Sequence, residues 1–111
     1  MKKYKLILLL LSLSFSQKVM IPMDQEQNNH LKAYGIAFFG LTKNMKIEWL
    51  LNYRGGSFLF DADQIIASEC RLRWVSFVFL SGTDLLKVYS KIDQENMDIV
   101  LLEKKPNIAI Y

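Results

Sequence analysis

The sequence has little of what small catalytic and metal-binding sites need. Its 111 residues include one cysteine, Cys70, and one histidine, His30. A single cysteine excludes an intrachain disulfide, so the chain is not a small disulfide-stapled scaffold. Pairs of metal ligands at helical spacing are missing, which predicts no metal site. The Walker and G-x-G-x-x-G patterns are missing too, and we expect no cofactor.

An excess of positive charge is also missing beyond the first residues. Lysine and arginine number 14 and aspartate and glutamate 11, and three lysines precede Leu6, which leaves 11 basic residues against 11 acidic ones. A nucleic acid requires a basic surface that releases counterions from phosphates, so nucleic acid is excluded as a partner. The remaining basic doublet, Lys104-Lys105, is explained by a solvated turn.

The first 16 residues have the layout of a secretory signal peptide. A lysine-rich head precedes an apolar stretch from Leu6 to Leu13, and a small-x-small site at Ser14–Ser16 precedes Gln17. The stretch is too short for a membrane span, which needs about 20 apolar residues. We expect an exported protein, periplasmic or secreted, without membrane association after signal removal.

The 95 residues that follow the first 16 of the 111 have room for one small domain. Strand-like runs alternate with helical patterns, which predicts an α/β fold: a Rossmann-like three-layer parallel sheet of order βαβαβα plus a terminal strand. Because the sequence stops within that strand, we expect an incomplete domain, the N-terminal fragment of a longer protein. The predicted strands cover 18–23, 46–53, 75–80 and 108–111, the predicted helices cover 31–44, 61–73 and 81–94, and 98–102 is either a strand or a helical turn.

Each predicted helix has an apolar stripe that we expect to be buried. Asn28 or Asn29 is expected to cap the first helix, Asp61 with Gln64 the second, and Ser81 the third. We expect Cys70 to be buried as part of the second stripe. The three stripes are Leu31, Tyr34, Phe38 and Leu41; Ala62, Ile65, Ile66 and Cys70 with Leu72 and Trp74; and Leu85, Val88, Tyr89 and Ile92.

The loops after the first three predicted strands, 24–30, 52–57 and 81–84, are expected to border one crevice. In an open parallel sheet, ligands bind beyond the carboxyl ends of the strands. Arg54 beside two glycines offers a guanidinium fork and main-chain donors to an anion. The expected ligand-binding residues are Asp24, His30, Asn52, Tyr53, Arg54, Gly55, Gly56 and Ser57.

Each of these loops also has a simpler interpretation. The Arg54 loop is equally a turn that needs left-handed glycines, with Arg54 in solvent. His30 forms an acid–base pair with Asp24 or is a polar neighbour of the helix cap. Ser81–Asp84 is either an anion-binding turn at a helix N-terminus or an ordinary strand-to-helix cap.

Three segments of the chain resemble an exported bacterial family often labelled asparagine synthetase B. The similar segments are Lys18–Asp24, Asn29–Ala37 and Trp49–Phe58, and parts of 96–111 fit the family too. The resemblance implies a longer protein and, by its label, amide-transfer chemistry. Asparagine synthetases combine an N-terminal nucleophilic cysteine with a Ser-Gly-Gly-x-Asp-Ser loop. Here Cys70 is internal and Ser81–Leu85 lacks the second glycine, so the resemblance assigns no catalytic residue.

Three hypotheses follow for the function. The first is an exported module that binds a small polar or anionic ligand through the residues above and is not catalytic alone. The second is part of an amide-transfer enzyme whose active residues lie beyond Tyr111. The third is a non-catalytic structural or interaction module. Oligomeric state is left open.

Overall fold

The computed structural model describes residues 17–104, which form five strands and three helices. The predicted signal peptide, residues 1–16, and the predicted terminal strand, 108–111, lie outside the described residues. In chain order the elements are β1 (Lys18–Ile21), α2 (His30–Thr42), β2 (Ile47–Leu50), β3 (Ser57–Asp61), α3 (Gln64–Leu72), β4 (Val78–Leu80), α4 (Gly82–Gln94) and β5 (Ile99–Leu102).

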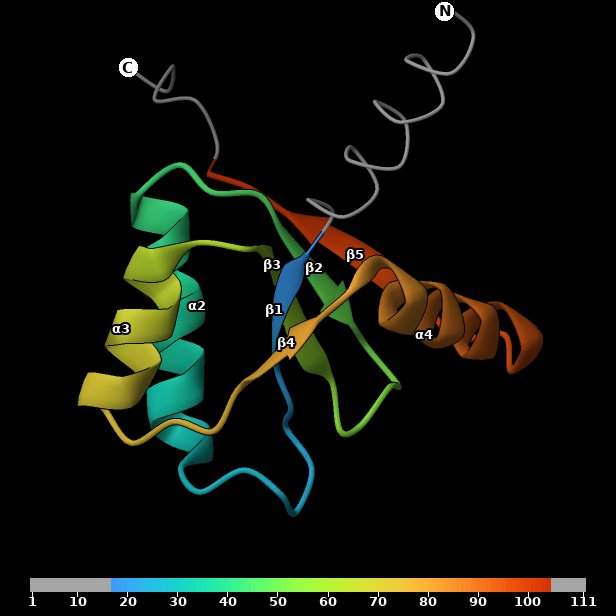
Figure 1. Ribbon diagram of the computed structural model, residues 1–111, viewed down its shortest axis with the longest axis horizontal. Helices are drawn as coiled ribbons and strands as arrows, with labels where there is room; N and C mark the ends of the chain where they lie inside the picture. Colours follow the sequence, from blue (N-terminus) through green and yellow to red (C-terminus); the bar gives the residue numbers. More distant parts are fainter. Residues whose placement is uncertain (1–16, 105–111) are drawn as a thin grey trace, which may run out of the picture.

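The sheet is antiparallel throughout, so the predicted parallel Rossmann-like sheet is wrong. Its strand order is β4-β1-β3-β2-β5, and every neighbouring pair runs antiparallel. The central strand β3 separates β1 from β2 (Figure 1). The sequence pattern does not predict a strand over 57–61, and this additional strand is what changes the topology.

The connection between β2 and β3 explains the error physically. Only residues 51–56 join the two strands, whereas a parallel crossover needs a dozen or more residues. Arg54, Gly55 and Gly56 adopt positive φ angles of 46°, 79° and 93°, and this turns the chain back on itself. A Gly-Gly pair between two apolar runs indicates a turn, and the pairing of 57–61 with β2 as a strand makes that turn a hairpin.

The first six elements, β1-α2-β2-β3-α3-β4, follow the order of the ferredoxin-like or split βαβ motif. α2 and α3 cover one face of the sheet and α4 covers the other (Figure 1). The alternation of strand side chains explains the division, because Val19 and Ile21 face α2 and α3 whereas Met20 faces α4. β5 then adds a fifth strand beside β2.

α2 packs on the sheet with its smallest side chains, contrary to the prediction. Ala33, Ile36, Ala37 and Gly40 are buried. A Cβ on Gly40 would lie 3.0 Å from the Phe60 ring, so the helix approaches the sheet closely there. The stripe expected to be buried faces outward: Leu31 is 81% exposed, Phe38 69% and Tyr34 51%, and Leu41 is half-buried.

The other two helices agree with the sequence to different degrees. α4 buries Leu85, Val88 and Ile92 as predicted, and Ser81 forms a capping box with Asp84. α3 begins later than expected, because Asp63 caps it and Asp61 ends β3. Its buried residues are Ile66, Ala67 and Cys70, while Ile65, Leu72 and Trp74 are exposed.

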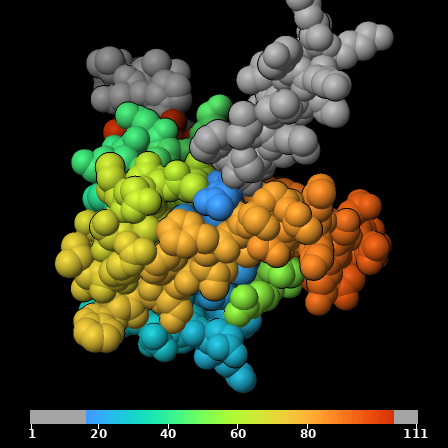
Figure 2. All heavy atoms as spheres, in the orientation of Figure 1, coloured from blue at the N-terminus to red at the C-terminus, as the bar shows by residue number. Residues whose placement is uncertain are grey.

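Both edge strands are exposed on one side. The segment from α3 to β4 forms the front of the molecule in the space-filling view (Figure 2), and β5 lies at the other edge of the sheet. β4 has three residues, fewer than the predicted 75–80.

Among residues 17–104, none of the helices has the length and apolar character needed to cross a membrane.

Candidate functional site

Two of the three predicted loops meet at one end of the sheet. β1 and β2 run in the same direction, so the loop after β1 and the loop after β2 lie together at the lower end of the molecule (Figure 1). β4 runs the opposite way, which places Ser81 at the other end. The three-loop crevice is therefore wrong, because parallel strands were its premise.

Asp24 and Arg54 form an ion pair that joins these two loops. Arg54 Nε donates to Asp24 Oδ2 at 2.7 Å, and Arg54 Nη2 donates to Oδ1 at 3.4 Å. The Glu26 main-chain N–H donates to the same carboxylate at 3.0 Å. The hydrogen bond from Arg54 holds the pKa of Asp24 below its ordinary value of 3.8. The guanidinium is thus committed to a partner within the chain.

The glycines beside Arg54 bring the two loops into main-chain contact. A Cβ on Gly55 would lie 2.5 Å from the main-chain oxygen of Met23, and the Met23 N–H donates to the Arg54 oxygen at 3.1 Å. The Gly56 oxygen accepts from the Trp49 indole at 3.0 Å. These contacts match the turn interpretation, in which the glycines allow left-handed backbone and close approach.

The His30 ring contacts the main chain of the β1–α2 loop. Its Nε2 lies 3.0 Å from the Met23 oxygen and 2.9 Å from the Asp24 oxygen. A carbonyl oxygen can only accept a hydrogen bond, so Nε2 carries a ring hydrogen and donates to the loop. The arrangement favours a structural role for His30 at the start of α2 over an acid–base pair with the Asp24 carboxylate.

The other predicted residues of the loop differ in exposure. Asn52 is exposed, whereas Tyr53 is half-buried and packs on the α4 side of the core. Ser57 is buried, and its hydroxyl donates toward the Tyr53 and Arg54 oxygens at 3.0 and 3.2 Å. The buried hydroxyl is therefore used to hold the turn.

Gln27 is the residue of this region that sequence reasoning missed. Its buried amide donates to the Pro22 and Ser76 oxygens at 2.8 and 2.9 Å, and its oxygen accepts from the Ser76 N–H at 2.8 Å. It therefore ties the β1–α2 loop to the segment before β4. A glutamine in a polar stretch carries no pattern that reveals such burial.

A second missed cluster lies on the α4 face of the sheet. The Tyr89 hydroxyl donates to Glu48 Oε2 at 2.6 Å, and Lys18 Nζ lies 3.4 Å from Glu48 Oε1 and 3.5 Å from Asp61 Oδ1. Burial, with the Glu48 carboxylate beside it, raises the pKa of Tyr89. The cluster connects α4 to three neighbouring strands, and its signal was Glu48 within an apolar strand.

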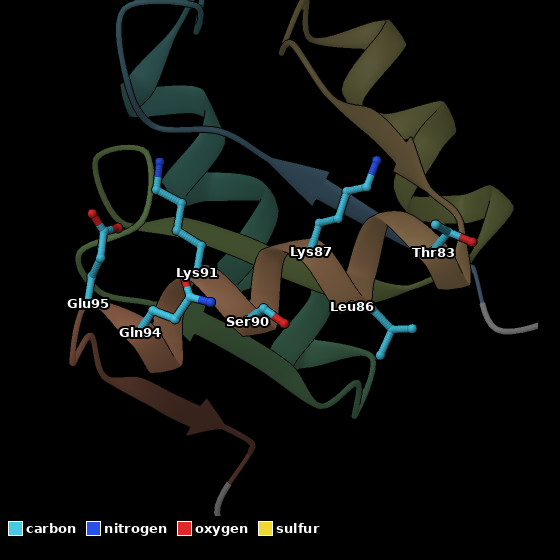
Figure 3. A pocket seen from close by; sticks show the side chains of 7 residues that line it. All are labelled: Thr83, Leu86, Lys87, Ser90, Lys91, Gln94 and Glu95. Atoms are coloured by element: carbon cyan, nitrogen blue, oxygen red, sulfur yellow. The ribbon is translucent and has the colours of Figure 1, made fainter.

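Two hollows of the surface lie away from the Arg54 loop. One of about 540 Å³ follows the outer side of α4, and its lining side chains come from that helix and its cap (Figure 3). Another, of about 390 Å³, adjoins Cys70 and Trp74. Burial raises the pKa of the Cys70 thiol to about 12, so Cys70 stays a thiol at neutral pH. Neither hollow gathers titratable groups suited to catalysis.

The most distinctive surface is apolar and joins α2 to β5. The Tyr34 ring packs edge-on against Phe58 at 5.7 Å between centroids, and Trp49 stacks on Phe58 at 5.9 Å. Val100 pairs with Trp49 across the sheet and is itself exposed. With Leu31 and Phe38, these side chains form what we call the α2–β5 surface: Leu31, Tyr34, Phe38, Trp49 and Val100.

A sequence signal for this surface existed. α2 carries apolar residues on two sides, one small and one large, so one helical stripe cannot account for them all. Two apolar sides imply two packing surfaces, of which the sheet covers one. The periodicity favours the larger side chains for the sheet, whereas the smaller ones permit the closer approach.

Within residues 17–104, no group of three or more His, Cys, Asp or Glu side chains is placed to hold a metal ion. A comparison with protein-family models, with curated proteins and with solved structures found no match to this chain. The βαββαβ order hosts unrelated functions, so the fold alone assigns none. Function must therefore be argued from the surface.

Proposed function

We propose that this chain is a non-catalytic interaction module, and that another polypeptide packs on its α2–β5 surface. One observation carries the proposal: α2 turns Ala33, Ala37 and Gly40 to the sheet and leaves Leu31 and Phe38 in solvent. Contiguous exposed apolar side chains of this size mark interaction sites on soluble proteins. Tyr34 links this side of the helix to the sheet, because its ring contacts Phe58, which stacks on Trp49, the strand partner of Val100.

The small-ligand hypothesis has weaker support from the geometry. Arg54 directs two of its nitrogens to Asp24, and the neighbouring Ser57 and His30 contact main-chain oxygens. An anion at this position would have to compete with the Asp24 carboxylate. The amide-transfer hypothesis stays a prediction about residues beyond Tyr111, because Cys70 is buried and held as a thiol.

The signal-peptide pattern supports placing this interaction outside the cytoplasm. Cys70 suits that location because a buried thiol is protected from oxidants. A partner met after export would cover the apolar side chains that the folded chain leaves exposed.

The test is a pair of double variants matched in chemistry and in exposure. Leu31→Gln with Phe38→Gln makes the α2–β5 surface polar, whereas Ile65→Gln with Leu86→Gln changes exposed apolar residues on α3 and α4. An apolar fluorescent dye, anilinonaphthalene sulfonate, reports accessible apolar surface, and sedimentation reports association. A sharp thermal transition in both variants ensures that the dye does not report a molten globule.

We expect the α2 variant to lose most of the dye signal and any association made through α2, while the control retains both. Both variants should unfold within about 0.5 kcal/mol of the parent chain, because exposed substitutions have small effects. A large loss of stability in the α2 variant alone would mean that Leu31 and Phe38 belong to the core, and would refute the proposal.

A further inference from the structure

β5 is an edge strand with none of the usual protection against pairing. Its sequence is Ile-Val-Leu-Leu, and Ile99, Val100 and Leu101 are all exposed on the strand. Edge strands of soluble proteins are normally blunted by a charged side chain, a proline or a bulge. The described residues of β5 carry none of these, so the strand can pair with another.

The ladder with β2 fixes which main-chain groups of β5 point outward. The Leu51 N–H donates to the Asp98 oxygen at 3.0 Å, so residues 98, 100 and 102 face β2. Antiparallel ladders alternate, and therefore Ile99, Leu101 and Glu103 direct their N–H and C=O groups away from the sheet. These three residues offer a row of outward donors and acceptors to another strand.

We propose that a second copy of this chain pairs with β5 in antiparallel register, with Leu101 opposite Leu101 at a two-fold axis. This inference deepens the proposed function, on which it rests, by naming the partner at one edge of the α2–β5 surface. The two five-stranded sheets then continue into one another. A two-fold axis normal to the sheet keeps α2 of both copies on the same face.

This register pairs the outward main-chain groups and brings apolar side chains together on the α2 side of the sheet. It sets outward-facing Leu101 against itself and outward-facing Ile99 against Glu103, which are hydrogen-bonded pairs. On the α2 side of the sheet, Val100 of one copy meets Leu102 of the other, so apolar side chains cover one another on that face. Leu101, 55% exposed in the single chain, is covered by its own counterpart.

Charge complementarity selects this register over its neighbour. With Leu101 on the axis, Asp98 of each copy lies opposite Lys104 of the other, giving two opposite-charge pairs at the ends. A register centred on Val100 would instead place the Asp98 carboxylate against Leu102. Asp98 and Lys104 are both exposed, and neither has an ion-pair partner among the described residues 17–104.

The other edge strand is less suited to the same role. β4 has three residues, compared with four in β5, and the segment before it is held by Gln27. A short edge strand offers fewer hydrogen bonds to a partner. The pairing of two β5 strands buries a small area, so the dimer should be weak and concentration-dependent.

The first experiment compares Leu101→Lys with Leu86→Lys by sedimentation equilibrium of the purified chain. Both substitutions add one positive charge at an exposed leucine, and Leu86 lies on the outer side of α4. In the Leu101→Lys variant, the two introduced lysines would face each other across the axis, where like charges oppose pairing. We expect the dimer dissociation constant to rise about tenfold or more for Leu101→Lys and to stay unchanged for Leu86→Lys.

The second experiment uses charge exchange, which a mere loss of folding cannot imitate. Asp98→Lys and Lys104→Asp each place like charges opposite one another, so each variant alone should dimerise less. Mixing the two variants should restore dimers, because the introduced lysine then faces the introduced aspartate, and the unchanged Asp98 faces the unchanged Lys104. The double variant Asp98→Lys with Lys104→Asp should also dimerise like the parent chain.

The outcomes separate this inference from the proposed function. Dimers that ignore the 98 and 104 exchanges but disappear with Leu31→Gln and Phe38→Gln would overturn β5 pairing and keep α2 as an interaction surface. A chain that stays monomeric at its highest soluble concentration would also overturn β5 pairing, while the dye test of α2 would stand separately. Restoration by mixing supports the inference.

Discussion

The Asp24–Arg54 loops and the α2–β5 surface differ in how many of their groups have an interaction partner within the chain. Around Asp24 and Arg54, the side chains of Asp24, Arg54, His30 and Ser57 all have partners within the chain, including an ion pair of 2.7 Å. On the α2–β5 surface, large apolar side chains and an unprotected strand edge face solvent. The first region is distinctive in sequence and the second is distinctive in structure.

The difference shows why unusual residues are a poor guide to a binding site by themselves. Arginine, glycine and serine in the β2–β3 loop are explained by the demands of a tight turn against a neighbouring loop. Leucine and phenylalanine on α2 look ordinary in sequence, but the fold leaves them without a packing partner among residues 17–104. A binding site is therefore better sought among side chains that the fold leaves exposed than among residues that are unusual in the sequence.

The largest expected effect comes from breaking the loop contact at Gly55. Gly55→Ala should destabilise the chain by about 4 kcal/mol, because the new Cβ meets the Met23 oxygen and the backbone has a positive φ. Chemical denaturation measures the change. Gly35→Ala is the matched control, since its Cβ has an ordinary contact within a helix, and it should stabilise by about 0.5 kcal/mol. Equal effects would contradict the close loop packing.

Substitutions on the two sides of α2 should differ almost as strongly. Ile36→Ala removes a fully buried side chain and should cost about 3 kcal/mol. Phe38→Ala removes a larger side chain that is mostly in solvent, and it should change stability by less than about 0.5 kcal/mol. Denaturant titration at low protein concentration separates the two. The reverse order would show that the helix is rotated.

Removing the Gln27 amide tests the link between the β1–α2 loop and the segment before β4. Gln27→Leu should cost about 2 kcal/mol, because the Ser76 N–H and the Pro22 oxygen lose their partner near the core. Hydrogen exchange at Ser76 should accelerate in the variant. An unchanged exchange rate there would mean that the amide does not hold this segment.

The smallest effect concerns pH and the Asp24–Arg54 pair. The pKa of Asp24 is lowered below 3.8, so its contribution is present above that value and is lost as pH falls through the lowered pKa. Asp24→Asn should therefore cost about 1 kcal/mol at pH 7. The difference from the parent chain should shrink toward zero in acid. A difference that is constant with pH would contradict an ionic contribution.

Parts of this structure could be predicted from the sequence because the causes are local. Asn29, Ser81 and Asn44 act at helix ends, where one side chain or one left-handed residue decides the boundary. The buried stripe of α4 was clear because its opposite side is polar. The burial of Cys70 followed from its position one turn after Ile66.

The remainder depended on contacts between distant segments. Phe58, Leu59 and Phe60 read equally as the end of a loop or as a strand, and only pairing with both β1 and β2 decides. The orientation of α2 depends on how closely Gly40 approaches Phe60, which local periodicity does not report. Asp24 and Arg54 meet because antiparallel pairing of β1 and β3 brings their loops together, and not through the parallel pairing that the sequence pattern predicts.

The most direct test of the account is the solvent exposure of α2, residue by residue. A soluble paramagnetic agent added to the dilute chain broadens the NMR signals of exposed methyl groups more than those of buried ones. The account predicts strong broadening for Leu31 and protection for Ile36. Equal protection of Leu31 and Ile36 in the monomer would contradict the claim that α2 presents its large apolar side to a partner.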